Sequence, residues 1–319
     1  MPKVSVVIPV YNAELYIERC VRSLFEQTLD DIEYIFVDDC SSDNSLLILN
    51  RLIEEFPKRK SQVMILYHSE NTGQSGARRD GMRAASGDYI IHCDSDDWVE
   101  LDMYEKMYNK AITTGADAVC CDMVMEFTSS QTYLKYNSDF SDHQLMYDCI
   151  APISVEYFSM CNRLISRKVL DRNTIEPFEG VNMWDDVGLS TRFRYYIQGS
   201  VVINEPLYHY NRQNDASTTR RPVLEKVQEM VDCVKQLEMF YYNEGVAGQY
   251  IRFIALLKLI AKHDLFHMDF DRWKNVFPDA HRYIYILKVQ YGLKAIIKLY
   301  MYACCERIAK VIARLKRRR

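Results

Sequence analysis

A dense group of acidic residues, Asp94-Ser95-Asp96-Asp97, follows an apolar run at residues 89–93. Three carboxylates so close together in the sequence repel one another unless a cation neutralises them. A small number of hard oxygen ligands suits Mg²⁺ or Mn²⁺ that is held jointly with the phosphates of a substrate. The alternative is that these acids favour the N-terminus of a following helix. The run therefore predicts a divalent-metal site for a phosphorylated ligand, with helix capping as the alternative.

Two other apolar runs also end in polar residues. Residues 4–10 precede Tyr11-Asn12, and residues 34–37 precede Asp38-Asp39. Continuous apolar runs of this length are typical of strands that are buried on both faces. In a parallel sheet, ligands bind beyond the carboxyl ends of the strands. We therefore expect these polar residues and the acidic run to lie along one edge of a sheet.

The segments between the strands have helical spacing. Apolar residues recur three or four positions apart from Ile17 onward and again from Leu46 to Phe56, and Asn12 is expected to cap the first of these helices. Residues 63–67 are a third predicted strand, and residues 76–85 are a third helix. Strands that alternate with helices in this way predict right-handed βαβ units. The predicted fold class is α/β, with a mostly parallel central sheet flanked by helices.

Two other phosphate-binding patterns are absent from the sequence. The dinucleotide fingerprint GxGxxG would follow the first strand, where the chain has Tyr11-Asn12-Ala13, and the Walker A pattern GxxxxGK[ST] does not occur. The chain instead has a short GxxG at residues 73–76, followed by Arg78-Arg79. A guanidinium group delivered toward the acidic strand ends is suited to clamping a diphosphate.

Five motifs occur in a fixed order: VVIPVYN at 6–12, VDDCSSD at 37–43, NTGQSGAR at 71–78, GDYI at 87–90 and DSDD at 94–97. Together they resemble the inverting family 2 glycosyltransferases, which have the GT-A fold and build glycans such as bacterial cell-surface polysaccharides. The resemblance covers roughly residues 3 to 215. It implies an enzyme that uses a nucleotide-sugar donor and Mn²⁺ or Mg²⁺.

The resemblance also implies roles for individual residues. Pro9 and Tyr11 match residues that flank the nucleobase, and Asp39 matches the acid that bonds to the base and ribose. Asp94 and Asp96 match the DxD pair. The implied nucleotide-sugar site comprises Pro9, Tyr11, Asn12, Asp39, Arg78, Asp94, Ser95 and Asp96, and the implied metal site comprises Asp96, Asp97 and His209.

His209 lies in the segment 207–212, which resembles the part of the family that closes over the diphosphate. It could complete the metal shell or contact the phosphates. The alternative is a structural histidine, which is the commoner role of an isolated one.

Transfer to an acceptor hydroxyl requires a base that removes the hydroxyl proton. The family uses an acidic pair roughly ninety residues after the DxD, and Asp185-Asp186 stands in that place. By position Asp186 resembles the base, with Asp185 in place of the usual Glu. Paired carboxylates can raise the pKa of one member, which suits a base near neutral pH. The alternative is that the pair caps a helix running to Tyr196.

Three positions depart from the family pattern. Cys40 replaces the usual Gly after the paired acids, and Arg79 replaces the usual Asn after Ala77-Arg78. Asp185 is one methylene shorter than the usual Glu. The third departure leaves open which acid of the pair acts as the base.

Two regions are predicted along the chain. Residues 1–221 are expected to form the catalytic domain, with a nucleotide-sugar half at about 1–125 and an acceptor half at about 126–221. Beyond residue 221 the apolar spacing is helical almost throughout. Residues 222–319 are therefore expected to form a helical region that ends in a basic tail.

Charge and cysteine usage narrow the partners and the compartment. The net charge of −4 and pI near 6.0 argue against nucleic-acid binding by the whole chain. Residues 291–319 carry nine basic side chains and one acidic one on an amphipathic helical pattern, which favours peripheral contact with an anionic membrane. The alternative is a tail that packs on its own domain. Irregularly placed cysteines, no signal-peptide pattern and no long apolar span predict a cytoplasmic location, with contact at the inner face of the plasma membrane.

The leading hypothesis is an inverting glycosyltransferase that moves a sugar from a nucleotide sugar, with a UDP-sugar favoured, to a glycan or lipid-linked acceptor. A nucleotide-sugar hydrolase or nucleotidyltransferase could use the same acidic edge, although the acids at 185–186 would then have no role. A catalytically inactive sugar-nucleotide binding module is the other alternative.

Overall fold

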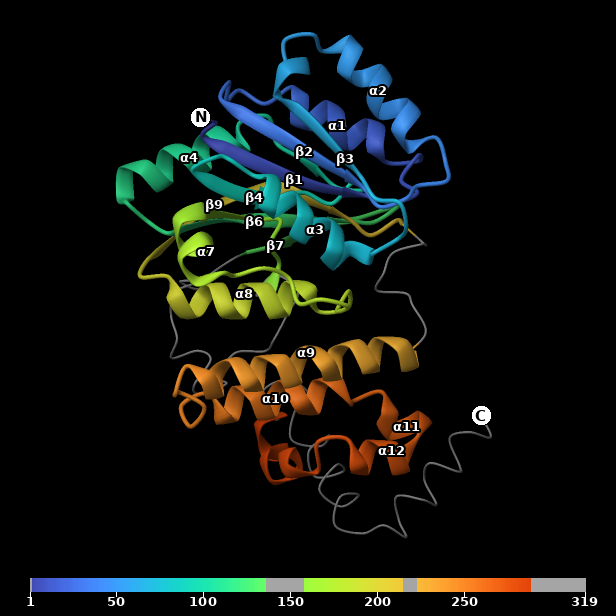
Figure 1. Cartoon of the computed structure of the whole chain (residues 1–319), viewed down its shortest axis with the longest axis vertical. Helices are drawn as coiled ribbons and strands as arrows, with labels where there is room; N and C mark the ends of the chain where they lie inside the picture. Colours follow the sequence, from blue (N-terminus) through green and yellow to red (C-terminus); the bar gives the residue numbers. More distant parts are fainter. Residues whose placement is uncertain (1, 136–157, 215–222, 288–319) are drawn as a thin grey trace. The chain divides into compact units, whose positions relative to one another are not determined.

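The computed structural model describes residues 2–135, 158–214 and 223–287. The chain divides into two compact units (Figure 1). The first consists of residues 1–141 and 155–217, and the second consists of residues 142–154 and 218–319. The domain boundary predicted near residue 221 lies outside the described residues. We call the first the catalytic unit and the second the helical unit.

Four parallel strands form one half of the sheet in the catalytic unit. Their order across the sheet is β3-β2-β1-β4, and the pairs β1–β2, β1–β4 and β2–β3 are all parallel. This confirms the parallel arrangement that the alternating apolar runs predicted. The strands are β1 (Val4–Val10), β2 (Ile32–Asp38), β3 (Val63–Tyr67) and β4 (Tyr89–His92).

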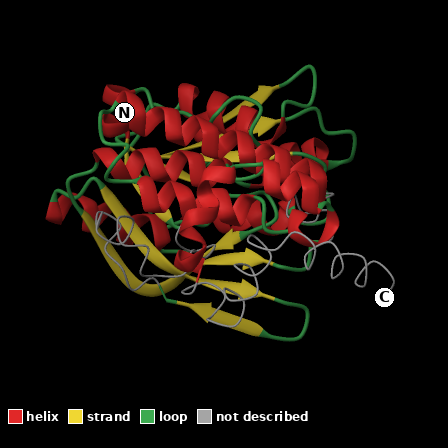
Figure 2. Cartoon of the chain, turned by 90° about the horizontal axis from the view of Figure 1, so that it is seen from below, coloured by secondary structure: helices red, strands yellow, loops and turns green. Residues whose placement is uncertain are grey.

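The sheet continues from β4 with mixed pairing, in the order β4-β8-β6-β9-β5. Figure 2 draws the strands of the chain in yellow and the helices in red. The pairs β4–β8, β6–β8 and β5–β9 are antiparallel, whereas β6 and β9 are parallel. A short strand, β7, pairs antiparallel with the far end of β6. These strands are β5 (Trp98–Val99), β6 (Ala118–Glu126), β7 (Gln131–Leu134), β8 (Arg163–Ser166) and β9 (Ser200–Asn211).

Helices cover both faces of this sheet. On one face, α1, α2 and α4 pack against side chains such as Val6 and Ile8, and on the other, α3, α7 and α8 pack against side chains such as Val7 and Ile90. Successive residues of a strand point to opposite faces, so a strand covered on both sides must be apolar throughout. The helices are α1 (Ile17–Phe25), α2 (Ser45–Glu55), the short 3-10 helix η1 (Lys60–Gln62), α3 (Gly73–Ala84), α4 (Met103–Thr114), α7 (Arg167–Asn173) and α8 (Asp185–Tyr196).

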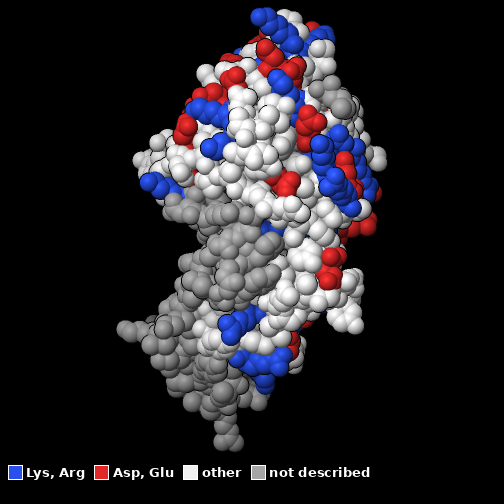
Figure 3. Space-filling model, turned by 90° about the vertical axis from the view of Figure 1, so that its left-hand side faces the viewer, with Lys and Arg blue, Asp and Glu red and all other residues white. Residues whose placement is uncertain are grey.

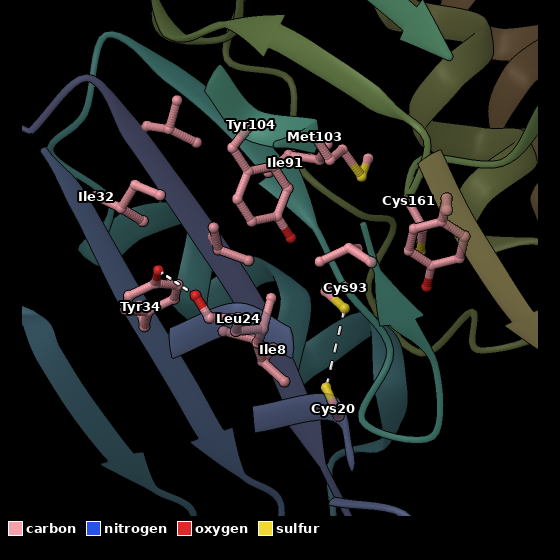
Figure 4. Close-up of a cluster of buried hydrophobic side chains, with 14 of the residues drawn as sticks. Ile8, Cys20, Leu24, Ile32, Tyr34, Ile91, Cys93, Met103, Tyr104 and Cys161 are labelled. Carbon is pink, nitrogen blue, oxygen red and sulfur yellow. Dashed lines mark hydrogen bonds between the residues drawn. The ribbon is translucent and has the colours of Figure 1, made fainter. Parts of the chain in front are cut away.

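The core on the α1 side also satisfies polar atoms (Figure 4). The buried hydroxyl of Tyr34 donates to the carbonyl oxygen of Leu24 at 2.5 Å. Burial raises the pKa of Tyr34 well above its usual value, so the phenol stays protonated and remains a donor. The thiols of Cys20 and Cys93 lie 3.9 Å apart in the same core. Ile91 and Cys93 belong to this core, so the core holds in place the end of β4 from which the acidic run begins.

The helical unit is built from two longer helices, α9 and α10, which are followed by three short elements, α11, α12 and η3. The rings of Tyr241 and Tyr250 stack with centroids 3.8 Å apart, which joins the end of α9 to the start of α10. Phe266, Phe270 and Trp273 form a second aromatic cluster. The described elements are α9 (Val223–Asn243), α10 (Ile251–Ala261), α11 (Leu265–Met268), α12 (Phe270–Asn275) and the 3-10 helix η3 (Pro278–Leu287).

No helix within the described residues is both long and apolar enough to cross a bilayer. The basic tail predicted at residues 291–319 lies outside those residues, so its membrane contact stays a prediction. On the face drawn in Figure 3, described Lys and Arg side chains are interspersed with Asp and Glu.

Candidate active site

Three parallel strands deliver polar residues to one edge of the sheet. Because β2, β1 and β4 are adjacent, the residues that follow their carboxyl ends are neighbours. At this edge Tyr11 is 52% exposed, which leaves its ring free to contact a ligand, whereas Asp39 is buried. Pro9 lies inside β1, where it pairs with Val37.

The loop after β1 is latched to the loop after β2. Asn12 has a positive φ of 48°, and its Oδ1 accepts a hydrogen bond from the backbone N–H of Ser42 at 2.9 Å. The backbone N–H of Ala13 donates to Oγ of Ser45 at 2.8 Å. The prediction that Asn12 caps the first helix is wrong, because α1 begins at Ile17 and Asn12 is committed to this latch instead. The latch holds together the two loops that carry Tyr11 and Asp39.

Cys40 also has a positive φ, of 64°. Backbones in this region favour glycine, because a Cβ atom crowds the adjacent carbonyl oxygen. The structure therefore explains why the family pattern has Gly at this position and what its replacement costs locally.

Asp39 is surrounded by hydrogen-bond donors. Its Oδ1 accepts from the backbone N–H and the hydroxyl of Thr72, at 2.8 and 2.9 Å, and its Oδ2 accepts from the backbone N–H of Gly73 at 2.8 Å. Nδ1 of His68 lies 2.8 Å from Oδ1. These contacts join the end of β2 to the start of α3, and they hold the carboxylate in one orientation.

Arg78 joins two carboxylates that are far apart in the sequence. Its guanidinium is buried and donates to Oδ1 of Asp94 at 2.6 Å and to Oδ2 of Asp185 at 2.5 Å. Burial alone lowers the pKa of Arg78, but the two carboxylates outweigh burial and raise that pKa above its usual value. The guanidinium therefore stays charged and ties the residue after β4 to the first turn of α8.

Sequence reasoning missed two polar residues that complete this arrangement. Nε2 of Gln74 donates to Oδ1 of Asp94 at 3.0 Å. Oδ1 of Asn182 accepts from the backbone N–H and the hydroxyl of Ser75, both at 3.1 Å. Gln74 precedes Arg78 by one helical turn, so the i, i+4 rule could have placed both on one face. Nothing local in the sequence marks Asn182, whose contact spans 107 positions.

Asn182 also accounts for the glycine that opens α3. A Cβ atom at Gly73 would lie 2.1 Å from Oδ1 of Asn182, and the backbone φ there is 79°. Both the space and the conformation at this position require glycine. The segment before α8 thus packs directly on the N-terminus of α3.

The acidic run forms a turn between β4 and β5. Helix capping does not explain it, because β5 comes next and α4 begins only at Met103. Asp97 is fully buried, where it accepts from the backbone N–H of Asn211 at 2.7 Å and from the hydroxyl of Tyr208. Burial and the charges of Asp96 and Asp94 raise the pKa of Asp97 well above its usual range. Both oxygens of Asp97 are thus used inside the fold.

Asp96 and Ser95 are more accessible than Asp97. Oδ2 of Asp96 accepts from Nδ2 of Asn214 at 2.8 Å. Burial, followed by the charge of Asp94, raises the pKa of Asp96 to about 6. A carboxyl group held so close to its neutral form gains from a cation that would neutralise it.

His209 lies on β9 beside Trp98 of β5. The two rings stack at 5.1 Å, and the ring nitrogens of His209 lie 2.8 Å from carboxylate oxygens of Glu126 and Glu100. Both nitrogens are therefore engaged by the protein. The metal role of His209 stays a prediction that requires one of these contacts to open.

Asp185 and Asp186 occupy the first turn of α8. The alternative for this pair was a role at the N-terminus of a helix. The position agrees with that alternative in part, since carboxylates are stabilised in the first turn of a helix. Asp185 is buried and bonded to Arg78, whereas Asp186 is half-buried and its Oδ1 accepts only from the backbone N–H of Val187 at 2.8 Å. Burial raises the pKa of Asp185 to about 6, against the effect of Arg78, and raises that of Asp186 as well.

The donor set fits a divalent cation that keeps ligands from its substrate. The described residues contain no group of three His, Cys, Asp or Glu side chains arranged to hold a metal ion. Asp94 and Asp96 each have one carboxylate oxygen without a hydrogen-bond partner in the described chain. Mg²⁺ and Mn²⁺ are commonly held by one or two carboxylates together with phosphates and water. The residues present therefore suit such an ion.

Comparisons with known proteins agree with this geometry. The family model described as Glycosyl transferase family 2 matches residues 5–174, more than half of the chain. Glycosyltransferase EpsJ of Bacillus subtilis (strain 168), described as uncharacterized, is 29% identical over 254 residues, which is 78% of this chain and 72% of EpsJ.

Two solved structures share the fold. S. aureus TarS 1–349 in complex with UDP-GlcNAc has a TM-score of 0.70 and 15% identity, covering 94% of this chain and 90% of TarS 1–349. The mannosyltransferase PcManGT of Pyrobaculum calidifontis, in complex with GDP-Man and Mn²⁺, has a TM-score of 0.57 and 18% identity, covering 95% and 80% of the two chains. The fold is therefore the GT-A fold. With the family match over the strands that build the site, this chain belongs to glycosyl transferase family 2 and transfers a sugar from a nucleotide sugar.

Proposed function

We propose that this chain is an inverting glycosyltransferase that moves a sugar from a nucleoside diphosphate, with UDP favoured, to a hydroxyl group of a glycan or lipid-linked acceptor in cell-surface glycan synthesis. The observation that supports this most is the guanidinium of Arg78, bonded to both Asp94 and Asp185. One side chain thereby joins the acidic turn of the donor half to the acidic pair at the start of α8.

The nucleoside part of the donor is assigned to the edge formed by Tyr11 and Asp39. Tyr11 offers an exposed ring next to a latched loop, and Asn12 and Pro9 set the path of that loop. Asp39 has four donors on its carboxylate, three of them on Oδ1. Each carboxylate oxygen has two lone pairs, and Oδ2 receives only the donor from Gly73, so it retains room for one further donor from base or ribose.

The sugar diphosphate is assigned to the acidic turn. Asp94 and Asp96 would hold Mn²⁺ or Mg²⁺ there, with Ser95 between them. The bound ion would neutralise charge that develops on the departing diphosphate. Both oxygens of Asp97 accept hydrogen bonds, from Asn211 and from Tyr208. Asp97 thereby anchors the acidic turn to β9.

We assign Asp186 as the base. Asp185 lies beside it and is held in one orientation by Arg78. Asp185 is bonded to the guanidinium of Arg78, whereas Oδ2 of Asp186 has no partner in the described chain. In the transfer, Asp186 takes the proton of the acceptor hydroxyl while that oxygen bonds to the anomeric carbon. The bond from that carbon to the diphosphate oxygen breaks, and the nucleoside diphosphate leaves with the electron pair. A single displacement from the opposite side inverts the anomeric centre.

Two measurements test this proposal. In a thermal-shift screen of UDP-, GDP- and dTDP-sugars, we expect a rise in the melting temperature that requires both a nucleotide sugar and Mn²⁺. The second measurement uses the donor that the screen identifies. The anomeric configuration of the sugar in the product is determined by NMR, and we expect it to be inverted. Retention of configuration would contradict the inverting mechanism. Equal sugar release with and without acceptor would favour a hydrolase.

The site of action is proposed to be the cytoplasmic face of the plasma membrane. The support is the run of basic residues at 291–319 in the sequence. Sedimentation with vesicles of anionic lipid, compared between the full chain and a chain ending at residue 290, tests it. Equal sedimentation of the two chains would contradict it.

A further inference from the structure

His68 has no role in the assignments above, yet it contacts the nucleoside edge. It follows β3, and its backbone N–H donates to the carbonyl oxygen of Asp38 at 2.9 Å. Its side chain is 11% exposed. Nδ1 lies 2.8 Å from Oδ1 of Asp39, and Nε2 lies 3.2 Å from Oδ2 of Asp80. The imidazole thus stands between a carboxylate of the β2 loop and a carboxylate of α3.

The second carboxylate, that of Asp80, also lies near two arginines. Oδ1 of Asp80 lies 3.4 Å from Nε of Arg79 and 3.8 Å from Nη1 of Arg83. Its other oxygen faces His68. Nε2 of His68 is buried without a hydrogen-bond partner among the described residues, so Asp80 faces the imidazole as a nearby charge, and the hydrogen bond of the ring goes to Asp39.

The contact with Asp39 occupies one particular oxygen. Oδ1 receives His68 together with the backbone N–H and hydroxyl of Thr72, whereas Oδ2 receives only Gly73. Turning the carboxylate out of its present plane would break the contact with His68 together with those to Thr72 and Gly73. His68 therefore disfavours that rotation, and Oδ2 remains the oxygen with an open lone pair.

We propose that His68 is a positioning residue for the donor nucleotide, which acts by holding Asp39 so that Oδ2 faces the nucleoside. This inference rests on the proposed function, because it takes Asp39 as a nucleoside ligand. It identifies His68 as a residue that affects nucleotide affinity without touching the nucleotide.

Three substitutions at His68 separate positioning from packing. His68→Asn keeps a nitrogen near the position of Nδ1 and loses the contact with Asp80. His68→Gln reaches toward the position of Nε2 and loses the donor to Asp39. His68→Ala loses both. His263→Gln is the matched control, because this half-exposed histidine lies in the helical unit beside Asp264.

Dissociation constants for UDP and for GDP, each with Mn²⁺, are measured by calorimetry, and melting temperatures are recorded for all variants. Loss of one hydrogen bond to a charged group is worth about tenfold in affinity. We expect His68→Ala and His68→Gln to weaken binding of the preferred nucleotide by about that factor. We expect His68→Asn to remain within about threefold of wild type, because its amide N–H still reaches Asp39.

Wild-type affinity in all three variants would overturn the inference. It would also be overturned if Asn and Gln weakened binding equally and in proportion to their loss of thermal stability, since that is the signature of a packing role alone. Failure of the wild-type chain to bind either nucleotide would instead contradict the proposed function, and the inference would fall with it.

Discussion

A buried cation in each unit has a different kind of partner. Arg78 in the catalytic unit is 3% exposed and is bonded to the carboxylates of Asp94 and Asp185. Lys262 in the helical unit is fully buried, and its ammonium contacts the carbonyl oxygens of Trp273, Val276 and Phe277 at 3.1, 2.6 and 3.1 Å. Carboxylates raise the pKa of Arg78, whereas burial lowers the pKa of Lys262 to about 7.

The difference separates a cation of the site from a cation of the fold. The partners of Arg78 are charged and belong to loops that carry the proposed chemistry. The partners of Lys262 are backbone carbonyls at the end of α12 and the start of η3, together with Nε2 of His281 at 2.7 Å. Unpaired carbonyls at a helix end need a donor, and Lys262 supplies it. Removing Arg78 should therefore damage activity and stability, and removing Lys262 should damage stability alone.

The largest expected effect is that of Arg78→Met. It leaves two carboxylates without their cation, and breaking such a buried pair costs about 3–5 kcal/mol of unfolding free energy. Lys262→Met is the matched control, with an expected cost of about 1–3 kcal/mol from its unpartnered carbonyls and with unchanged nucleotide binding. Urea unfolding and calorimetric titration with UDP and Mn²⁺ measure both. Equal stability losses with equal nucleotide affinities would remove the distinction between the two cations.

Asp186→Asn tests the acid that Arg78 does not bond. A missing general base lowers turnover by about 10²- to 10⁴-fold, and the isosteric amide should leave the donor affinity within about twofold. Once the donor and acceptor are identified, the turnover number of Asp186→Asn is compared with that of Asp171→Asn. The second variant is the control, because it changes an exposed acid on α7. Undiminished turnover would exclude Asp186 as the base.

Metal affinity should fall in acid because of Asp96. The pKa of its carboxyl is raised to about 6 by burial and by Asp94, so protons compete with the ion below that pH. Without metal the sign is opposite: the raised pKa contributes stability that is present below pH ~4 and is lost as the pH rises through about 6. Mn²⁺ titrations between pH 5 and pH 7.5 should show affinity falling by about tenfold per unit on the acid side. A flat profile would contradict the role of Asp96.

The helical unit should respond to pH in the alkaline range. The pKa of Lys262 is lowered to about 7 in the folded chain, whereas the unfolded chain has the usual lysine pKa of 10.5. Between these values the unfolded chain binds more protons, so stability rises with pH by at most about 1.4 kcal/mol per unit. The difference between wild type and Lys262→Met, followed by urea unfolding at pH 7, 8 and 9, isolates this effect. If the difference in unfolding free energy is the same at all three pH values, the ammonium of Lys262 stays charged beside its carbonyl acceptors and the predicted effect is contradicted.

The smallest expected effect concerns Cys40. Its φ of 64° is costly for a residue with a Cβ, whereas glycine loses more entropy on folding. Cys40→Gly should therefore raise the unfolding free energy by about 0.5–1 kcal/mol net. Cys233→Ala, at a buried thiol of the helical unit, serves as a contrast and should be destabilising. A lower melting temperature for Cys40→Gly would show that the thiol contributes more than the backbone strain removes.

Much of the catalytic unit was predictable from local pattern. The apolar run at 4–10 matches β1, which is covered on both faces, and the run at 63–67 matches β3, an edge strand whose Met64 and Tyr67 are exposed. The polar residues after β1, β2 and β4 could be placed on one edge, since parallel strands end on the same side of a sheet. Asn12 was misassigned because Asn favours both helix caps and left-handed turns, and the choice depended on Ser42.

Sequence alone determined the residue types of the site and the strand ends that carry them, because backbone alternation and chain direction are local properties. Tertiary structure decided which polar atoms of those residues have partners within the protein. Asp97 and His209 match the implied metal site by position, yet their polar atoms are bonded to Tyr208, Asn211, Glu126 and Glu100. Arg78 and Asp185 lie 107 positions apart, and their contact exists only because α3 and α8 pack on the same face of the sheet. No local pattern encodes such a pairing, since its energy depends on burial that the whole fold creates.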